Sequence, residues 1–518
     1  MTTPRNNDAN QALQAAMRCH QEGRIYDAEL HYARALELEP DNVQALRLRG
    51  VLARERGDVE LALQLLRKAT ELQPSSAEPQ AEIALTLMMA GDLQGAEDAF
   101  RDALTLAPNA IDTLANFGAL LQHRGHLKAA IDVYREILAQ DAGEIEIRCN
   151  LAKALADRGD TAAALAEVDT AIEQSGGRRG SYAARGAVLI DAGRYADAAT
   201  ALQLAVEHNP PDDMALVNLA LCCHELGDTS TANGWLTRAV ELNPHNARAV
   251  SDLVTNLSAL DNHAEAIALA ESFLGEYPAE RLVIGSYAQA LLNAGRQDEA
   301  RHLTDSAQLI QVFDLPAPDA FASADQFHAA LAAELRNDPS LVDNPVSKST
   351  AGGQQTGELN LQQSLAMRAF AEMANATVSA AADTYLERGL SNHPVMLPAA
   401  KDWRLRAWGT LIDAGGQQTP HMHPLGWLSA VYYVELPSGM TSGGAHAGWL
   451  EFGQPPARMT SRVESPTRCI EPVPGRLVIF PSWFWHRTLP FTLPAKSNAQ
   501  RISIAFDVMP FNRKLSSL

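Results

Sequence analysis

The 518-residue sequence has little cysteine, no long apolar run and no basic surplus, and each shortage excludes a class of protein. Its five cysteines are scattered without metal-site spacing, so we expect neither a disulfide framework nor a cysteine metal centre. No stretch approaches the roughly 18 uninterrupted apolar residues of a membrane span, and the first residues lack the apolar core of a signal peptide. These absences predict a cytoplasmic protein that makes no membrane contact.

Acidic charge is concentrated in the first part of the chain. Residues 313–518 hold 16 of the 42 Lys+Arg and 17 of the 62 Asp+Glu, so residues 1–312 hold 26 and 45 and carry a net charge of −19. Phosphate binding requires a basic surface, which excludes nucleic acid as the main ligand. The acidity is compatible with a basic peptide partner, and equally with a surface that is merely well solvated.

A 34-residue period runs from about residue 9 to about residue 310. One repeat position holds glycine in eight of nine units and Asp261 in the other, an alanine follows five residues later, and a proline closes most units. Glycine permits the positive φ of a tight turn, alanine allows two helices to approach closely, and proline ends a helix. The nine units resemble tetratricopeptide repeats, helix pairs that stack into a superhelical solenoid. The resemblance implies a groove that binds a protein or peptide.

One polar position on the first helix of the repeats suggests how such a groove holds its ligand. Asn116, Asn150 and Asn218 occupy this position in the fourth, fifth and seventh repeats. In some tetratricopeptide proteins, such as the O-linked N-acetylglucosamine transferase of animals, asparagines here bind a peptide backbone. The resemblance implies that these three residues bind peptide; alternatively they are solvated surface.

The sequence changes character after Gln311. Residues 311–324, with two prolines around Ala317, read as a linker, and residues 325–518 as a second domain. Helical spacing predicts helices over 325–337 and 360–389, separated by a polar, glycine-rich loop at 348–357. From Trp403 onward, aromatic and β-branched runs between Gly- and Pro-containing turns predict strands. We therefore expect an α+β multidomain chain: a helical solenoid, then a double-stranded β-helix (jelly roll) with flanking helices.

Three histidines and an arginine near the C-terminus have the composition of an iron site. His421 and His423 are two residues apart, His486 follows much later, and Arg501 lies fifteen residues beyond it. Imidazoles held on a β scaffold are suitable ligands for Fe(II), and an arginine provides a two-pronged donor for a carboxylate. The pattern predicts a metal centre beside an acid-binding side chain.

The segments around these residues resemble a bacterial and phage group of iron(II)/2-oxoglutarate-dependent dioxygenases. The matching motifs are H-x-H-P at 421–424, S-x-V-Y-Y at 429–433, P-G-x-L-x-x-F-P-S-x-x-x-H at 474–486 and R-x-S at 501–503. The resemblance covers about 200 residues, and four motifs in order are specific. It implies Fe(II) and 2-oxoglutarate as cofactors, with O2 as cosubstrate. His421 and His486 would ligate the metal, and Arg501 would bind the far carboxylate of 2-oxoglutarate, helped by Ser503 or Tyr433.

The wider superfamily has a carboxylate two residues after the first histidine, where this chain has His423. Either His421, His423 and His486 form a three-imidazole site, which we favour, or another side chain ligates. Glu451 and Asp413 are the carboxylates that could take that place.

The two halves together predict a hydroxylase whose repeats recruit a protein or peptide substrate. A second reading is a small-molecule oxygenase whose repeats serve assembly. A third, from another class, is a tetratricopeptide scaffold whose oxygenase-like domain is inactive or binds metal only. The substrate, the hydroxylated atom and the oligomeric state stay open at this level.

Overall fold

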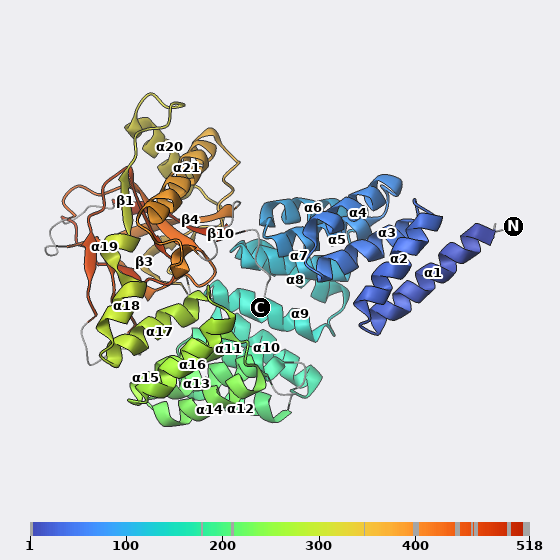
Figure 1. The fold of residues 1–518 in the computed structure, drawn as a ribbon, viewed down its shortest axis with the longest axis horizontal. Coiled ribbons are helices and arrows are strands. Elements are labelled where there is room, and N and C mark those ends of the chain that lie inside the picture. Colours follow the sequence, from blue (N-terminus) through green and yellow to red (C-terminus); the bar gives the residue numbers. More distant parts are fainter. Residues whose placement is uncertain are drawn as a thin grey trace. The chain divides into compact units, whose positions relative to one another are not determined.

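The computed structural model describes residues 4–177, 180–208, 212–345, 348–396, 403–440, 446–456, 459, 465–494 and 499–510. It confirms a helical array followed by a strand-rich domain, as expected for an α+β multidomain chain (Figure 1). None of the described helices combines the length and apolar character needed to span a lipid bilayer.

Consecutive helices of the described array form antiparallel pairs, one pair for each 34-residue repeat. The pairs are α1(Pro4–Gln21)/α2(Ile25–Leu38), α3(Val43–Glu55)/α4(Val59–Leu72), α5(Ala77–Ala90)/α6(Leu93–Leu106), α7(Ile111–His123)/α8(Leu127–Gln140), α9(Ile145–Asp157)/α10(Thr161–Ser175), α11(Ser181–Asp191)/α12(Tyr195–His208), α13(Asp213–Glu225)/α14(Thr229–Leu242), α15(Ala247–Ala259)/α16(His263–Glu276) and α17(Arg281–Asn293)/α18(Gln297–Thr304).

The repeated glycine position makes the turn within each pair. Every glycine at this position has a positive φ, from 69° at Gly193 to 91° at Gly159, and Asp261 adopts the same conformation with a φ of 64°. An aspartate often follows the glycine and caps the next helix; the Asp58 carboxylate, for example, accepts the Leu61 N–H at 3.1 Å. The 34-residue period of the sequence therefore reflects a tight turn and a helix N-cap that recur in the repeats.

The strands form one curled antiparallel sheet in the order β1-β8-β5-β10-β4-β9-β6-β7, with β2 and β3 attached beside β4. Their bounds are β1(Gln311–Asp314), β2(Val342–Asp343), β3(Thr350–Gln355), β4(Trp403–His421), β5(Leu428–Glu435), β6(Leu450–Phe452), β7(Arg468–Ile470), β8(Arg476–Pro481), β9(His486–Thr488) and β10(Arg501–Pro510). The long helix α21(Leu365–Glu387) and α20(Ala324–Arg336) flank it; His328 of α20 bonds to the Tyr432 hydroxyl of β5 at 2.8 Å.

Two segments differ from the sequence-based expectation. Gln311–Asp314, part of the predicted linker, is strand β1, which follows the short helix α19(Ser306–Leu309) and pairs with β8. The predicted loop at 348–357 contains strand β3, paired with β4. Its glycines permit this pairing, because a Cβ on Gly352 would lie 2.7 Å from the Cα of Gly416. The domain limits proposed from the sequence stay a prediction.

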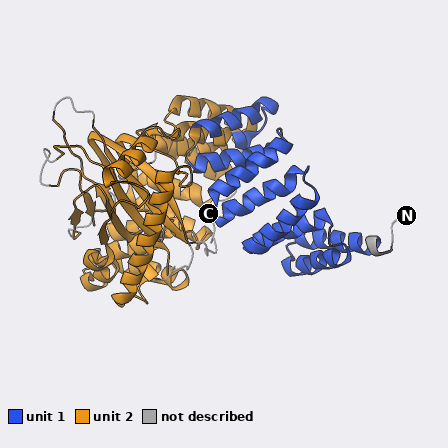
Figure 2. Ribbon diagram, turned by 90° about the horizontal axis from the view of Figure 1, so that it is seen from above, with its two compact units in different colours: residues 1–124, 128–147 blue, residues 125–127, 148–518 orange. Residues whose placement is uncertain are grey.

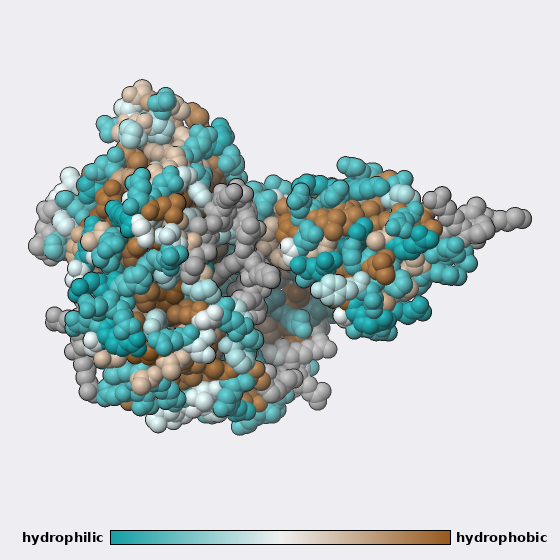
Figure 3. Space-filling model, viewed as in Figure 1, coloured by the Kyte–Doolittle hydropathy of each residue, from teal (hydrophilic) through white to brown (hydrophobic). Residues whose placement is uncertain are grey.

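The chain divides into two compact units (Figure 2). Unit 1 comprises residues 1–124 and 128–147, and unit 2 comprises residues 125–127 and 148–518. Unit 2 thus contains the last repeats together with the sheet, and one apolar core runs from Leu216 of α13 to Val508 of β10. In unit 1 the apolar side chains form smaller clusters within neighbouring helix pairs, such as the one around Tyr32. The face in Figure 3 is mostly hydrophilic, with apolar residues in separate groups.

Candidate metal centre

The structure brings His421, His423 and His486 together where β4 ends and β9 begins, two neighbouring strands inside the sheet. His421 is the last residue of β4, His423 follows two residues later, and His486 begins β9, directly opposite His421 in the β4–β9 pairing. One ring nitrogen from each imidazole lies within 4.8 Å of the other two. In the part of the chain that the structure describes, these three side chains form a group of potential ligands that lie close enough together to hold one metal ion.

The outward nitrogen of each imidazole is fixed by a hydrogen bond. The Nδ1 atoms of His421 and His486 lie 2.7 and 3.0 Å from the carbonyl oxygens of Thr419 and Phe484, and Nδ1 of His423 lies 2.7 Å from Oδ1 of Asp507. A carbonyl or carboxylate can only accept here, so each Nδ1 carries a proton, and Nε2 is the nitrogen that holds the lone pair when the ring is neutral. This tautomer is the one in which an imidazole ligates a metal through Nε2.

Asp507 on β10 is the centre of a small buried network. Besides His423 it binds the Ser429 hydroxyl at 2.7 Å, and Ser429 lies 2.9 Å from the Ser482 hydroxyl. Asp507 is only 6% exposed, so its charge is compensated by these bonds rather than by water. The sequence alone indicates no role for either residue: Ser429 stands in the S-x-V-Y-Y motif, whereas Asp507 belongs to no recognisable motif.

Burial keeps the imidazoles of His421 and His486 neutral. It lowers the pKa of His421 to about 3, with the neighbouring His423 ring acting in the same direction. Burial also holds the pKa of His486 well below its ordinary value, and the two other imidazoles add to this effect. A metal ligand must be deprotonated, so these environments suit cation binding rather than proton binding.

The two alternative carboxylates are engaged elsewhere. Glu451 faces Arg487, whose Nε and Nη2 both lie 2.7 Å from Glu451 Oε1. Its neighbour Phe452 is the residue opposite His486, and side chains alternate along a strand, so Glu451 points to the other face. Asp413 is exposed and accepts a hydrogen bond from Gln500 at 2.9 Å. Neither belongs to the histidine cluster.

The three residues predicted to bind the cosubstrate lie on adjacent strands. Ser503 of β10 is opposite Tyr433 of β5 on one side and Thr410 of β4 on the other. Arg501 is fully buried, with its guanidinium carbon 5.0 Å from the centre of the Tyr433 ring and Nη1 3.4 Å from the Ser503 hydroxyl. Within the described chain, Arg501 Nε and Nη2 and the Tyr433 hydroxyl are buried without a hydrogen-bond partner. Burial lowers the pKa of Arg501.

A buried guanidinium with two free donors is costly unless a ligand satisfies it, and a carboxylate is its best match. The donor set of this site therefore fits a metal ion held by imidazoles and an acid held by Arg501.

The three asparagines of the predicted peptide ladder lie on first helices of their repeats: Asn116 on α7 in unit 1, Asn150 on α9 and Asn218 on α13 in unit 2. Asn150 is exposed and the other two are half-buried. Their role in binding peptide stays a prediction.

Comparison with known families identifies both kinds of module. The tetratricopeptide repeat family matches residues 21–77, 149–212 and 183–247. A family described as "Putative 2OG-Fe(II) oxygenase" matches residues 406–507, which hold all three histidines, Arg501 and Asp507. The chain therefore combines tetratricopeptide repeats in its N-terminal region with a domain of this oxygenase family at residues 406–507.

Solved structures match the repeats. A tetratricopeptide repeat protein from Parabacteroides merdae is 16% identical, with 46% of this chain and 94% of that chain covered and a TM-score of 0.42. YrrB, a tetratricopeptide protein with an unusual peptide-binding site, is 18% identical over 42% of this chain and 95% of its own, with a TM-score of 0.27. A search of curated proteins gave no match.

Proposed function

We propose that the chain is an Fe(II)- and 2-oxoglutarate-dependent oxygenase, a hydroxylase in its simplest form, whose repeats recruit a protein or peptide. The observation that carries this proposal is the fully buried Arg501, with two donors unsatisfied by the described protein, in the same sheet as three converging imidazoles. The unpaired guanidinium does not improve the stability of a ligand-free fold, because buried unpaired charge is destabilising. Each of the two features is accounted for by a bound partner.

In this proposal the residues of the site have separate roles. His421, His423 and His486 would hold Fe(II) through Nε2, and Arg501, Ser503 and Tyr433 would hold the far carboxylate of 2-oxoglutarate. With O2, this pair of cofactors supplies oxidative decarboxylation of the 2-oxo acid to succinate and CO2, coupled to oxidation of a substrate C–H bond. Asp507 would keep His423 in the ligating tautomer, and the aromatic side chains around the site would exclude water.

The competing proposal is a repeat scaffold with an inactive or metal-only domain. It differs from the first in a single measurable property, which is metal-dependent binding of 2-oxoglutarate. A third histidine in place of a carboxylate leaves the iron with one more positive charge, so activity has to be measured directly.

Anaerobic calorimetry of 2-oxoglutarate with Fe(II) tests the proposal. We expect micromolar, metal-dependent binding that is lost in His486→Ala and Arg501→Met. His245→Ala, an exposed histidine of the repeats, serves as the matched control and keeps full affinity. Absence of binding to the folded, metal-loaded wild type would remove the oxygenase and leave the scaffold.

A further inference from the structure

The glycine-rich segment at residues 348–357 lies against the metal centre. Its second residue, Ser349, has its hydroxyl oxygen 3.3 Å from Nε2 of His421. This is the nitrogen through which His421 would ligate a metal, because Nδ1 of the same ring is bonded to the Thr419 carbonyl. Ser349 stands outside the four sequence motifs that predict the site, yet it is a polar side chain directly at a predicted metal ligand.

The sheet holds Ser349 in this position. Thr350 is opposite Gln418 in the pairing of β3 with β4, and the Ser349 carbonyl accepts the Thr419 N–H at 2.8 Å. The ladder of backbone hydrogen bonds therefore extends by one residue beyond β3. His421 follows Thr419 by two residues on β4, which brings its ring within reach of the Ser349 hydroxyl.

Glycines allow β3 to lie this close to β4. A Cβ on Gly353 would lie 2.5 Å from the Leu411 carbonyl oxygen, and one on Gly416 would overlap the carbonyl oxygen of Gly352. The register of the two strands shifts between Ala351 and Gly353, which is a bulge in the ladder. Larger residues here would push the strands apart and carry Ser349 away from the metal centre, so the glycine-rich composition of the segment has a consequence at His421.

The Ser349 hydroxyl is the donor in this contact. Nδ1 of His421 donates to a carbonyl, and burial lowers the pKa of the ring to about 3, so the ring is neutral and Nε2 holds a lone pair. Nε2 can then only accept, and Ser349 Oγ donates to it. One lone pair can accept a hydrogen bond or bind a metal ion, but not both. Ser349 and a metal ion therefore compete for the same nitrogen.

His421 differs in this respect from the two other imidazoles. Among the described residues, His423 and His486 are held through Nδ1, and no hydroxyl bonds to their Nε2 atoms. A partner at the outward nitrogen orients a ligand and raises its basicity, whereas a partner at the ligating nitrogen must be displaced. Asp507, behind His423, and Ser349, in front of His421, therefore act on metal binding with opposite signs.

We propose that Ser349 is a further residue of the metal centre, whose hydroxyl occupies the ligating lone pair of His421 and is displaced when a metal binds. This inference rests on the proposed function for His421 as a ligand, but it concerns the uptake of metal and not the oxidation that follows. The hydroxyl satisfies a partly buried acceptor, which would otherwise be costly, and it lowers the metal affinity of the site. Ser349 is a positioning residue rather than a catalytic one.

Anaerobic titration of the full chain with Fe(II), without 2-oxoglutarate, compares variants of Ser349. Ser349→Ala should bind Fe(II) about 3- to 5-fold more tightly, which corresponds to about 0.6–1 kcal/mol, the strength of one modest hydrogen bond. Ser349→Thr keeps the hydroxyl and should restore the wild-type affinity. Ser379→Ala, at an exposed serine of α21 whose hydroxyl bonds within its own helix, is the matched control and should change nothing.

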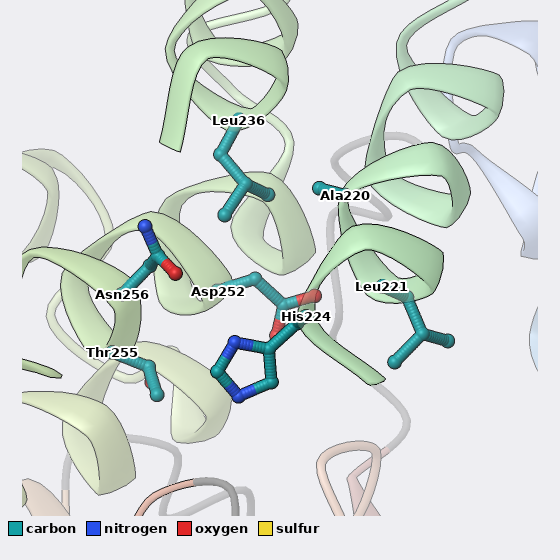
Figure 4. Close-up of a pocket in the computed structure, with 7 residues that line it drawn as sticks. All are labelled: Ala220, Leu221, His224, Leu236, Asp252, Thr255 and Asn256. Atoms are coloured by element: carbon teal, nitrogen blue, oxygen red, sulfur yellow. The ribbon is translucent and has the colours of Figure 1, made fainter. Parts of the chain in front are cut away.

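A second imidazole near a carboxylate tests whether the titration measures the site in the sheet. The cavity between α13 and α15 (Figure 4) is lined by Ala220, Leu221, His224, Leu236, Asp252, Thr255 and Asn256. Asp252 is paired with Arg248 at 2.6 Å, and within the described chain no third ligand joins it and His224 in a metal-binding group. His224→Ala should therefore keep the wild-type affinity for Fe(II). A loss of binding would place the measured ion in the repeats and overturn the proposal.

The nitrogen NMR resonance of His421 Nε2 gives a readout that needs no metal. In protein stripped of metal by a chelator, Ser349→Ala should shift this resonance because the hydrogen bond to the lone pair is lost, whereas Ser379→Ala should leave it in place. His421→Gln assigns the signal by removing it. An unmoved resonance would show that the hydroxyl does not bond to this nitrogen, and the proposal would fail.

Fe(II) affinity that is unchanged or weaker in Ser349→Ala would also overturn the proposal, since the hydroxyl would then not compete with the metal. Calorimetry of 2-oxoglutarate is read separately. If it fails while Ser349→Ala still tightens Fe(II) binding, the oxygenase is lost and the role of Ser349 remains. If 2-oxoglutarate binds and Ser349→Ala behaves as wild type, the oxygenase remains and the role of Ser349 is lost.

Discussion

Unit 1 and unit 2 each bury an arginine, and they treat it in opposite ways. Arg124 of unit 1 is 3% exposed and pairs with the equally buried carboxylate of Glu97, while its Nη2 also bonds to the Gln94 amide oxygen at 3.1 Å. Arg501 of unit 2 is fully buried, and among the described residues no carboxylate pairs with it. A charge satisfied inside the protein serves its fold, whereas a charge left unsatisfied is available to a ligand.

The same contrast applies to buried acids. Glu97 joins one repeat of unit 1 to the next, whereas Asp507 of unit 2 orients the ring of His423. A buried charge alone therefore does not identify a binding site. The partner of the acid distinguishes the two units: Glu97 pairs with Arg124, which serves the fold, whereas Asp507 bonds to His423, whose other ring nitrogen can bind a ligand.

The largest expected effect is on unit 1. Arg124→Met leaves the buried Glu97 carboxylate with only the exposed Arg101 as a counter-charge, and breaking a buried pair in this way costs up to about 3–5 kcal/mol. Urea unfolding followed by circular dichroism should record a loss of this size. Asp98→Ala, which removes a carboxylate that is 64% exposed, should stay within about 1 kcal/mol of wild type. Equal losses in both variants would contradict a structural role for the pair.

Arg501→Met is the counterpart in unit 2. It removes an uncompensated buried charge and leaves no carboxylate unpaired, so the ligand-free protein should be as stable as wild type or more stable, by up to about 1–4 kcal/mol. The same variant should lose 2-oxoglutarate binding. Thermal unfolding with and without the acid measures both effects, and a strongly destabilised variant would show that Arg501 serves the fold.

Asp507→Asn should have the smallest effect of the three. The amide keeps the shape of the side chain but loses the charge that holds His423, and such changes behind a metal ligand reduce metal affinity about 10- to 100-fold. Anaerobic titration with Fe(II) measures this change, with Asp413→Asn as an exposed control. Unchanged affinity would show that the His423–Asp507 bond is not part of the metal centre.

Structural features that depend on residues close together in the sequence could be predicted well. The repeat turns follow from glycine and from the aspartate caps, both of which act within a few residues. The three histidines could be predicted as a group because two lie in one short motif and the third in another. Their convergence then required only that β4 and β9 pair.

What depends on distant pairing was missed. Gln311–Asp314 is only four residues long and becomes a strand because β8, more than 160 residues later, accepts it. Lys348–Gly357 reads as a loop until β4 is present to pair with it. Asp507 acquires its role only through contact with His423, 84 residues away. The approach of α17 to the site has the same origin, because a Cβ on Gly285 would overlap the end of the Met422 side chain, far away in the sequence.

The single core that joins the last repeats to the sheet also limits how such a protein can change over time. Repeats that contact only their neighbours can be duplicated or deleted with little consequence for the rest of the array. We expect such duplications and deletions to be tolerated before α9, because the repeats of unit 1 form a compact unit of their own. After α13 this tolerance ends, because removing one helix pair would shift every residue that the core holds against the sheet. The array can therefore lengthen or shorten from its N-terminal end, while the repeats beside the metal centre are inherited together with it.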